Sequence, residues 1–106
     1  MGPDVRVLWS PAAEQDLHEI WLHFAAIASR DVADQLLRAI GDAVQRIAEH
    51  PLAWQERAEL GANMRACPVH PYAIFYRIRT DIPEIVRILH VRRGVARIIG
   101  APQQPI

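Results

Sequence analysis

Alternating apolar and polar side chains predict two strands in the C-terminal half of the chain. In residues 72–79 every second side chain is apolar, and Arg77 and Arg79 fall among those between them. Because successive side chains of a strand point to opposite faces, this segment has one apolar and one basic face. Residues 85–92 are apolar on both faces, with Arg87 on the face opposite Val86. That pattern is typical of a central strand.

A third strand and an N-terminal strand complete the predicted sheet. Residues 64–69 read as an edge strand, because Pro68 cannot donate to a sheet ladder. Three consecutive strands with short turns form an antiparallel meander. If Pro68 blocks one edge, the N-terminal strand, residues 5–9, must pair beyond the last strand. Residues 85–92 then lie in the centre of the sheet.

Two helices are predicted between the N-terminal strand and the meander. Ser10 and Pro11 predict a helix start, since serine accepts from free amide groups and proline tolerates the first helical position. The second helix is expected to begin near Asp31, which with Asp34 resembles a capping box, and to end at His50. Their short link predicts an antiparallel hairpin. Its apolar stripes comprise Ala13, Leu17, Ile20, Trp21, Phe24 and Ile27 or Ala28, then Ala33, Leu36, Leu37, Ile40, Val44, Ile47 and Ala48.

The predicted fold class is therefore α+β, with the helical hairpin packed on one face of a four-stranded sheet. At 106 residues the chain fits a single domain, residues 1–106. Residues 1–4 and 100–106 are expected to be flexible. The loop at residues 51–63 is expected to be anchored by Trp54 and Leu60, and the apolar segment 94–99 to dock back.

Composition excludes several classes of chemistry. All twelve basic residues are arginine, so no lysine can serve as acid, base or Schiff-base former. Cys67 is the only cysteine, which excludes an internal disulfide and a multi-cysteine zinc site. No apolar run approaches the roughly 18 residues of a membrane span, and no signal peptide is recognisable. We expect a cytoplasmic protein without a membrane partner.

The charges are segregated along a chain whose net charge is zero. Residues 1–63 hold ten acidic residues and five arginines, whereas residues 64–106 hold seven arginines and two acidic residues. Such segregation can steer partners of opposite sign to different surfaces. Ordinary scatter of surface charge would give the same counts.

Catalytic and metal-binding motifs are not found. The sequence has no Gly-rich phosphate loop, His-Glu-x-x-His pair or serine-nucleophile elbow. His18 and His23 are five positions apart on a helix and point in different directions, so no shared metal is expected. Asp16 with Glu19 is interpreted as an exposed pair of carboxylates. We predict no catalytic residue, no metal and no cofactor.

Arginines are the strongest candidates for binding. Arg77, Arg79 and Arg87 are expected to share the sheet face opposite the helices, with Arg65, Arg92 and Arg93 nearby in sequence. Guanidinium groups there could bind phosphates or the carboxylates of a partner. The alternative is a solvated face that only prevents aggregation. His90, at the end of the core-facing row, is interpreted as a packed histidine.

Five segments in order resemble the small toxins of the RelE and ParE superfamily of bacterial toxin–antitoxin pairs. They are WSPAAEQDLHEIW, AEHP, ELGANMR, YAIFYRI and ILHVRR, which together span most of residues 5–93. The resemblance implies the fold predicted above. The ribonuclease branch carries basic sheet-face residues and a C-terminal tyrosine, whereas this chain has Ala73, Val95 and Ile99 at the corresponding positions. The sequence is more similar to the ParE branch, although Gly94 replaces its usual acidic residue.

The resemblance implies a non-enzymatic toxin that inhibits DNA gyrase and is neutralised by a cognate ParD-like antitoxin. The antitoxin would contact Trp21, Phe24 and Leu37 together with Arg65, Arg77, Arg79 and Arg87. The target would contact His90, Arg92 and Arg93. No direct sequence-specific DNA binding is expected. The alternative function is a ribosome-dependent mRNA endoribonuclease of the RelE type.

Overall fold

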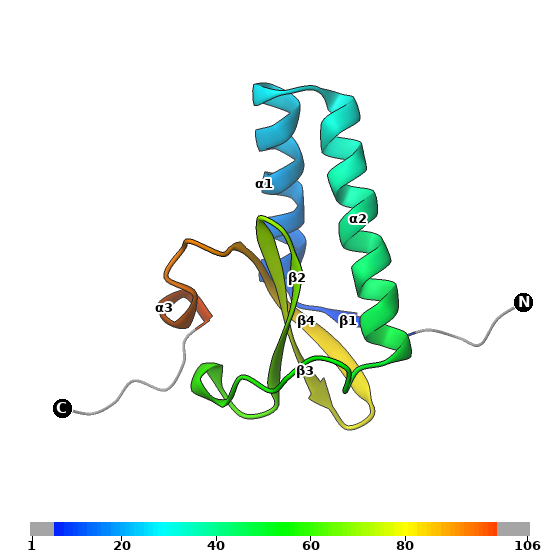
Figure 1. Cartoon of the computed structure of the whole chain (residues 1–106), viewed down its shortest axis with the longest axis vertical. Coiled ribbons are helices and arrows are strands. Elements are labelled where there is room, and N and C mark those ends of the chain that lie inside the picture. The colour runs from blue at the N-terminus through cyan, green and yellow to red at the C-terminus, as the bar shows by residue number, and fades with distance from the viewer. Residues whose placement is uncertain (1–5, 100–106) are drawn as a thin grey trace, which may run out of the picture.

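A computed structural model describes residues 6–99. It has two long helices on one side of a four-stranded sheet (Figure 1). The sheet order is β1-β4-β3-β2, with β1 parallel to β4 and the other pairs antiparallel. The predicted fold class and strand order are confirmed. The elements are β1 (Leu8–Trp9), α1 (Pro11–Ile27), α2 (Arg30–Glu49), the 3-10 helix η1 (Ala58–Leu60), β2 (Met64–Val69), β3 (Tyr72–Arg79), β4 (Ile82–His90) and α3 (Val95–Ile99).

Two element boundaries differ from the sequence prediction. β1 contains only Leu8 and Trp9, and Val5 lies outside the described residues. β4 begins at Ile82 and ends at His90, earlier at both ends than predicted. The tight turn at residues 80 and 81 lets pairing extend to Arg79 and Ile82. None of the helices within residues 6–99 is long and apolar enough to cross a membrane.

Ser10 joins the start of α1 to the middle of the sheet. Its hydroxyl oxygen accepts a hydrogen bond from the amide of Ala13 at 2.9 Å, as the predicted cap requires. The same hydroxyl donates to the carbonyl of Val86 at 2.7 Å, and the Ser10 amide donates to the Ile85 carbonyl at 3.0 Å. One residue therefore caps the helix and fixes it to β4.

The cap of α2 is a correction to the sequence prediction. Ser29, in extended backbone conformation, accepts from the Val32 amide at 3.1 Å and starts the helix. Asp31 lies in the first turn, where a carboxylate favours the positive end of the helix dipole. Asp34 instead accepts from the indole N–H of Trp21 at 2.8 Å and ties the two helices together. The end of α2 before His50 agrees with the prediction.

The end of the hairpin where α1 passes into α2 stands clear of the sheet (Figure 1). The buried positions of α1 stop at Ile20, whereas Ile27 is 64% exposed. Ala28 is exposed as well, so the prediction that Ile27 or Ala28 belongs to the buried stripe is wrong, because no strand lies beneath that turn (Figure 1). Leu22 and Val32 are also exposed near the same end.

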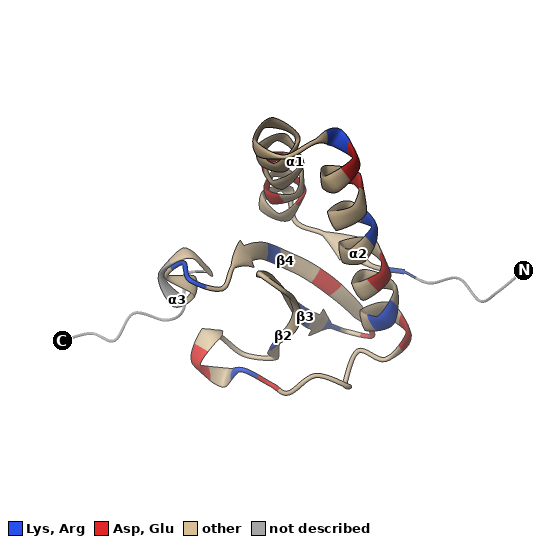
Figure 2. Ribbon diagram, turned by 45° about the horizontal axis from the view of Figure 1, so that its top comes forward, with Lys and Arg blue, Asp and Glu red and all other residues tan. Residues whose placement is uncertain are grey.

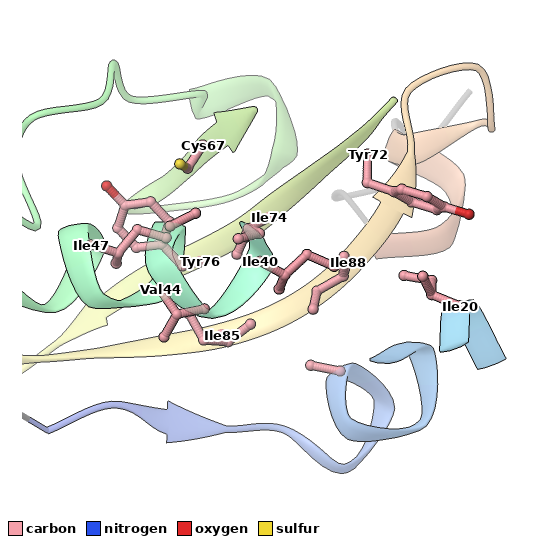
Figure 3. Packing of buried hydrophobic residues seen from close by; sticks show 12 residues of the cluster. Ile20, Ile40, Val44, Ile47, Cys67, Tyr72, Ile74, Tyr76, Ile85 and Ile88 are labelled. Atoms are coloured by element: carbon pink, nitrogen blue, oxygen red, sulfur yellow. The ribbon is translucent and has the colours of Figure 1, made fainter. Parts of the chain in front are cut away.

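The main core fills the space between the hairpin and the sheet (Figure 3). Tyr76 and Ile74 of β3 lie at its centre and are fully buried. Burying apolar surface stabilises a fold by roughly 25 cal/mol per Å², so this layer is the main source of stability. The buried members are Ala13, Ile20, Ile40, Ala43, Val44, Ile47, Cys67, Tyr72, Ile74, Tyr76, Ile85 and Ile88.

A bulge in β4 changes the face on which several side chains lie. Tyr76 pairs with Ile85 and Phe75 pairs with Arg87, so Val86 is left without a partner in β3. The extra residue shifts the alternation of β4, because two residues then oppose one. Ile85 and Ile88 consequently both join the main core, although they are three positions apart. The prediction that Ile85 lies opposite the core side is wrong.

A second apolar cluster covers the sheet face opposite the helical hairpin. Phe75 and Leu89 from the sheet pack with Leu60 of η1. Val95, Ile98 and Ile99 of α3 pack against the same cluster, as predicted for residues 94–99. The face predicted to be basic is therefore partly apolar and partly covered.

The buried hydroxyl of Tyr76 predicts sensitivity to alkali. It donates to the carbonyl of Pro51 at 2.6 Å, and burial raises the pKa of Tyr76 to about 12. The ordinary tyrosine pKa is about 10, so the unfolded chain ionises first. Stability is unaffected below about pH 10 and should fall as the pH rises toward 12. Denaturant unfolding at several pH values measures this fall.

Tyr76→Phe is the matched variant for that measurement. It should cost about 1 kcal/mol near neutral pH, through loss of the hydrogen bond to Pro51. It should also flatten the alkaline decrease in the free energy of unfolding, since no phenol remains to ionise there. An unchanged alkaline slope in the variant would contradict the assignment to Tyr76.

Candidate functional site

An apolar groove runs along the helical hairpin. It has a volume of about 500 Å³ and is lined by β1, α1 and α2. Trp9, Leu17, Trp21 and Leu37 supply its apolar surface, and Glu14 and His18 are the polar lining residues. The four apolar side chains come from three elements, which the helical spacing and the β1 pairing bring together. An aromatic or aliphatic anchor from a partner would fit such a surface.

Two of the three apolar candidates for antitoxin binding meet in this groove. Trp21 and Leu37 both line it, and the indole of Trp21 is held by its hydrogen bond to Asp34. Phe24 lies elsewhere: its ring meets that of Tyr72 edge to face, with centroids 6.3 Å apart. Phe24 therefore packs on the main core, where it is half-buried.

The arginines do not form one basic face. Arg77 and Arg79 lie on the predicted side of β3, but both contact the carboxylate of Glu84, at 2.9 and 3.4 Å. Arg65 donates to the carbonyl of Trp54 and so supports the loop before β2. Along β4, basic and acidic positions occur together (Figure 2). Arg77 and Arg79 therefore meet at Glu84, whereas Arg87 contacts Asp16 instead.

Arg87, which pairs with Phe75 in the sheet, reaches α1 and forms an ion pair with Asp16. Its Nε and Nη2 atoms donate to the two carboxylate oxygens at 2.7 and 2.8 Å. This hydrogen bond, more than any other factor, raises the pKa of Arg87. Asp16 also accepts from the amide of Ile88 at 2.9 Å. The prediction that Asp16 is exposed is wrong: it is 8% exposed and caps the backbone beside the bulge.

His90 and Arg93 line a smaller cleft beside the middle of α1. Its volume is about 210 Å³, and its walls come from α1, β3, β4 and the residues after β4. The ring of His90 meets that of Tyr72 with centroids 5.5 Å apart. The Nδ1 atom of His90 accepts from the amide of Arg92 at 3.1 Å. The lining residues are Asp16, Glu19, Ile20, His23, Tyr72, Ile88, His90 and Arg93.

The three candidates for target binding lie near one another, but only two of them share this cleft. Arg92 and Arg93 are exposed and His90 is half-buried. Arg92 does not line the cleft. Sequence reasoning missed Glu19, His23 and Tyr72 as members of the same site. Tyr72 pairs with His90 in the observed register, but the predicted strand bounds, 72–79 and 85–92, did not give this pairing.

No metal site was found in the described part of the chain. Residues 6–99 contain no group of three histidine, cysteine, aspartate or glutamate side chains placed to hold an ion. Cys67 is a buried free thiol, and burial raises its pKa, which makes it a poor nucleophile.

Comparisons with known proteins agree on one family. The family described as "ParE toxin of type II toxin-antitoxin system, parDE" matches residues 7–95. "Toxin ParE1" of Mycobacterium tuberculosis (strain ATCC 25618 / H37Rv) is 33% identical over 93 residues, which are 87% of this chain and 95% of that protein. "Toxin ParE1" of Caulobacter vibrioides is 32% identical over 91 residues, 86% and 94% of the two chains.

A solved structure supports the fold. A chain of "Chromosomal ParDE TA system from P. aeruginosa" superposes with a TM-score of 0.73 at 19% identity, covering 83% of this chain and 97% of that chain. At this identity the likeness concerns the architecture alone. The family match covers residues 7–95 of this chain, and each of the two relatives aligns over most of this chain and nearly all of its own length. This chain belongs to the ParE toxin family of type II toxin–antitoxin systems.

Proposed function

We propose that this chain inhibits DNA gyrase by binding it and is neutralised by a cognate ParD-like antitoxin. Membership of the ParE family supports a toxin of a type II pair. The single observation that carries the antitoxin part is the groove of about 500 Å³ between β1, α1 and α2. An amphipathic antitoxin helix would insert apolar side chains between Trp21 and Leu37.

The groove suits a peptide partner better than a small polar substrate. Its apolar lining residues, Trp9, Leu17, Trp21 and Leu37, are half-buried in the free chain. Covering them removes apolar surface from water, which is the main driving force of association. Two tryptophans in one groove also favour strong binding, since tryptophan is enriched among residues that dominate interface energies.

The charge pairs on the sheet favour binding over catalysis. Arg87 is held by Asp16, and Arg77 and Arg79 share Glu84. An arginine in such an ion pair supports structure, whereas a ribonuclease needs cations that contact the scissile phosphate and stabilise the charge of the transition state. The second apolar cluster further limits access to the sheet face opposite the helices. These features support a non-enzymatic toxin.

The proposed target contact predicts a specific loss of gyrase inhibition. The purified chain should inhibit DNA supercoiling by gyrase, and the double variant Arg92→Ala with Arg93→Ala should be at least about tenfold weaker, because two exposed cations are removed from one surface. The matched control is Arg30→Ala with Arg38→Ala, which removes two exposed cations from α2. The assay measures the toxin concentration that halves supercoiling.

A parallel assay tests the ribonuclease alternative. The same protein is added to ribosomes translating a defined message, and cleavage is mapped by primer extension. Codon-specific cleavage without any effect on supercoiling would overturn the gyrase proposal. Equal losses in both double variants would instead contradict the assignment of His90, Arg92 and Arg93 to the target surface.

A further inference from the structure

The cleft beside the middle of α1, lined by His90 and Arg93, is rich in hydrogen-bond donors. Arg93 supplies a guanidinium group, Tyr72 a hydroxyl, and His23 and His90 supply imidazole rings. Because Nδ1 of His90 accepts the amide of Arg92, the neutral ring carries its proton on Nε2 and can donate there. These donors come from α1, β3, β4 and the segment after β4, so they surround the cleft from several sides.

Tyr72 is the best indication that the cleft is built for a ligand. Its side chain packs against Phe24 and His90, and the residue is only 9% exposed. Its ring belongs to the main core, whereas its hydroxyl makes no hydrogen bond within residues 6–99 and is accessible from the cleft. In Figure 3 the hydroxyl points away from the other core residues. Burial raises the pKa of this hydroxyl, and the charge of Arg93, which lines the same cleft, partly offsets the rise.

The acidic residues of the cleft are largely compensated. Asp16 gives both oxygens to Arg87 and one also to the Ile88 amide. Glu19 accepts from the side-chain amide of Gln15 at 2.9 Å and adds to the field at Arg87. With both histidines neutral the cleft is close to electrically neutral.

We propose that this cleft is a binding site for a single phosphodiester group. Its volume is about 210 Å³. That is below the roughly 300–1,000 Å³ typical of sites for whole small molecules, so the cleft suits one ionic group and its immediate substituents. The separate donors of Tyr72, His90 and Arg93 match a tetrahedral oxyanion better than a planar carboxylate, which one arginine can satisfy alone.

The test uses dimethyl phosphate as the probe and acetate as a control of equal charge. Both are monoanions at about pH 7, so a difference in their binding reflects the geometry of the anion and not its charge. Binding to the full chain is followed by NMR, through the ring signals of His23 and His90. At about pH 7 we expect saturable binding of dimethyl phosphate and weaker binding of acetate.

Neighbouring arginines provide matched variants. Arg93→Gln should weaken dimethyl phosphate binding about tenfold, whereas Arg92→Gln, which alters an exposed residue outside the cleft, should change it less than about twofold. Tyr72→Phe should also weaken binding and leave thermal unfolding nearly unchanged, because the lost hydroxyl has no partner in the described chain. Equal effects of the two arginine variants, or equal affinity for acetate, would overturn the proposal.

A dinucleoside monophosphate forms the second arm of the test. Tighter binding than dimethyl phosphate would assign the group to a nucleic-acid strand, and equal binding would show that the phosphodiester alone is recognised. Both results support the site. Shifts that fail to saturate with either compound would overturn it. The binding test contains no gyrase, so its outcome does not depend on the gyrase proposal. The two proposals also differ at Arg92, which is expected to matter for the target contact but not for phosphodiester binding.

Discussion

Asp16→Ala is expected to lower the free energy of unfolding by about 3–5 kcal/mol. The change removes three hydrogen bonds, two from Arg87 and one from the Ile88 amide. It leaves a guanidinium with 22% side-chain exposure without its counter-ion, and breaking a buried ion pair on one side typically costs this much. Urea denaturation of the two proteins measures the difference.

A double variant separates the ion pair from the backbone cap. Asp16→Leu with Arg87→Met removes both charges, and should recover part of the loss, because apolar replacements of buried pairs are often tolerated. The Ile88 amide still lacks its acceptor, so about 1–3 kcal/mol should remain. Asp42→Ala, on the exposed face of α2, is the control and should change stability by less than about 0.5 kcal/mol. A loss for Asp16→Ala no larger than this control would contradict the structural role.

Leu37→Glu is expected to weaken antitoxin binding by at least about 30-fold, equivalent to about 2 kcal/mol. Leu37 lines the groove on α2 opposite Trp21 of α1. A carboxylate there would have to be desolvated when an apolar antitoxin side chain inserts. Calorimetric titration of the variant with the ParD-like antitoxin measures the affinity, and circular dichroism checks that the variant is folded.

Leu22→Glu is the matched control for the groove. Leu22 is 48% exposed and adjoins Trp21 in sequence, but it is not one of the residues that line the groove. The control should alter the dissociation constant less than about threefold, since exposed positions outside an interface contribute little. If both variants weakened binding equally, the antitoxin would contact the outer face of α1 as well, and the groove proposal would fail.

The sequence was sufficient to predict the strand order but not the register within β4. Pro68 identifies β2 as an edge strand of the sheet, and the apolar residues 85–92 identify β4 as an inner strand. Both conclusions follow from the chemistry of single residues. Val86 could not be identified as the extra residue in the bulge. Ile85, Val86 and Ile88 are all apolar, so the pattern allows either alternation.

The ion-pair partner of Arg87 could not be predicted either, because the strand pattern does not specify where α1 and its carboxylate at position 16 lie against β4. The cleft was unpredictable for a different reason: Glu19, His23, Tyr72, His90 and Arg93 come from segments far apart along the chain. Trp21 and Leu37, in contrast, were predicted individually, because helical periodicity selects them without knowledge of the tertiary contact.

The hydrogen bonds of Ser10 to β4 have a consequence for synthesis on the ribosome. Ser10 bonds to Ile85 and Val86, and β1 pairs with β4 alone. Residues near the N-terminus therefore cannot form these bonds until a strand more than seventy residues later in the sequence has been synthesised. The hairpin of α1 and α2 can form before that, because its contacts are local. The groove wall that contains Trp9 is completed only after β4 has left the exit tunnel. A nascent chain should thus be unable to present the full antitoxin-binding groove before its translation is almost finished.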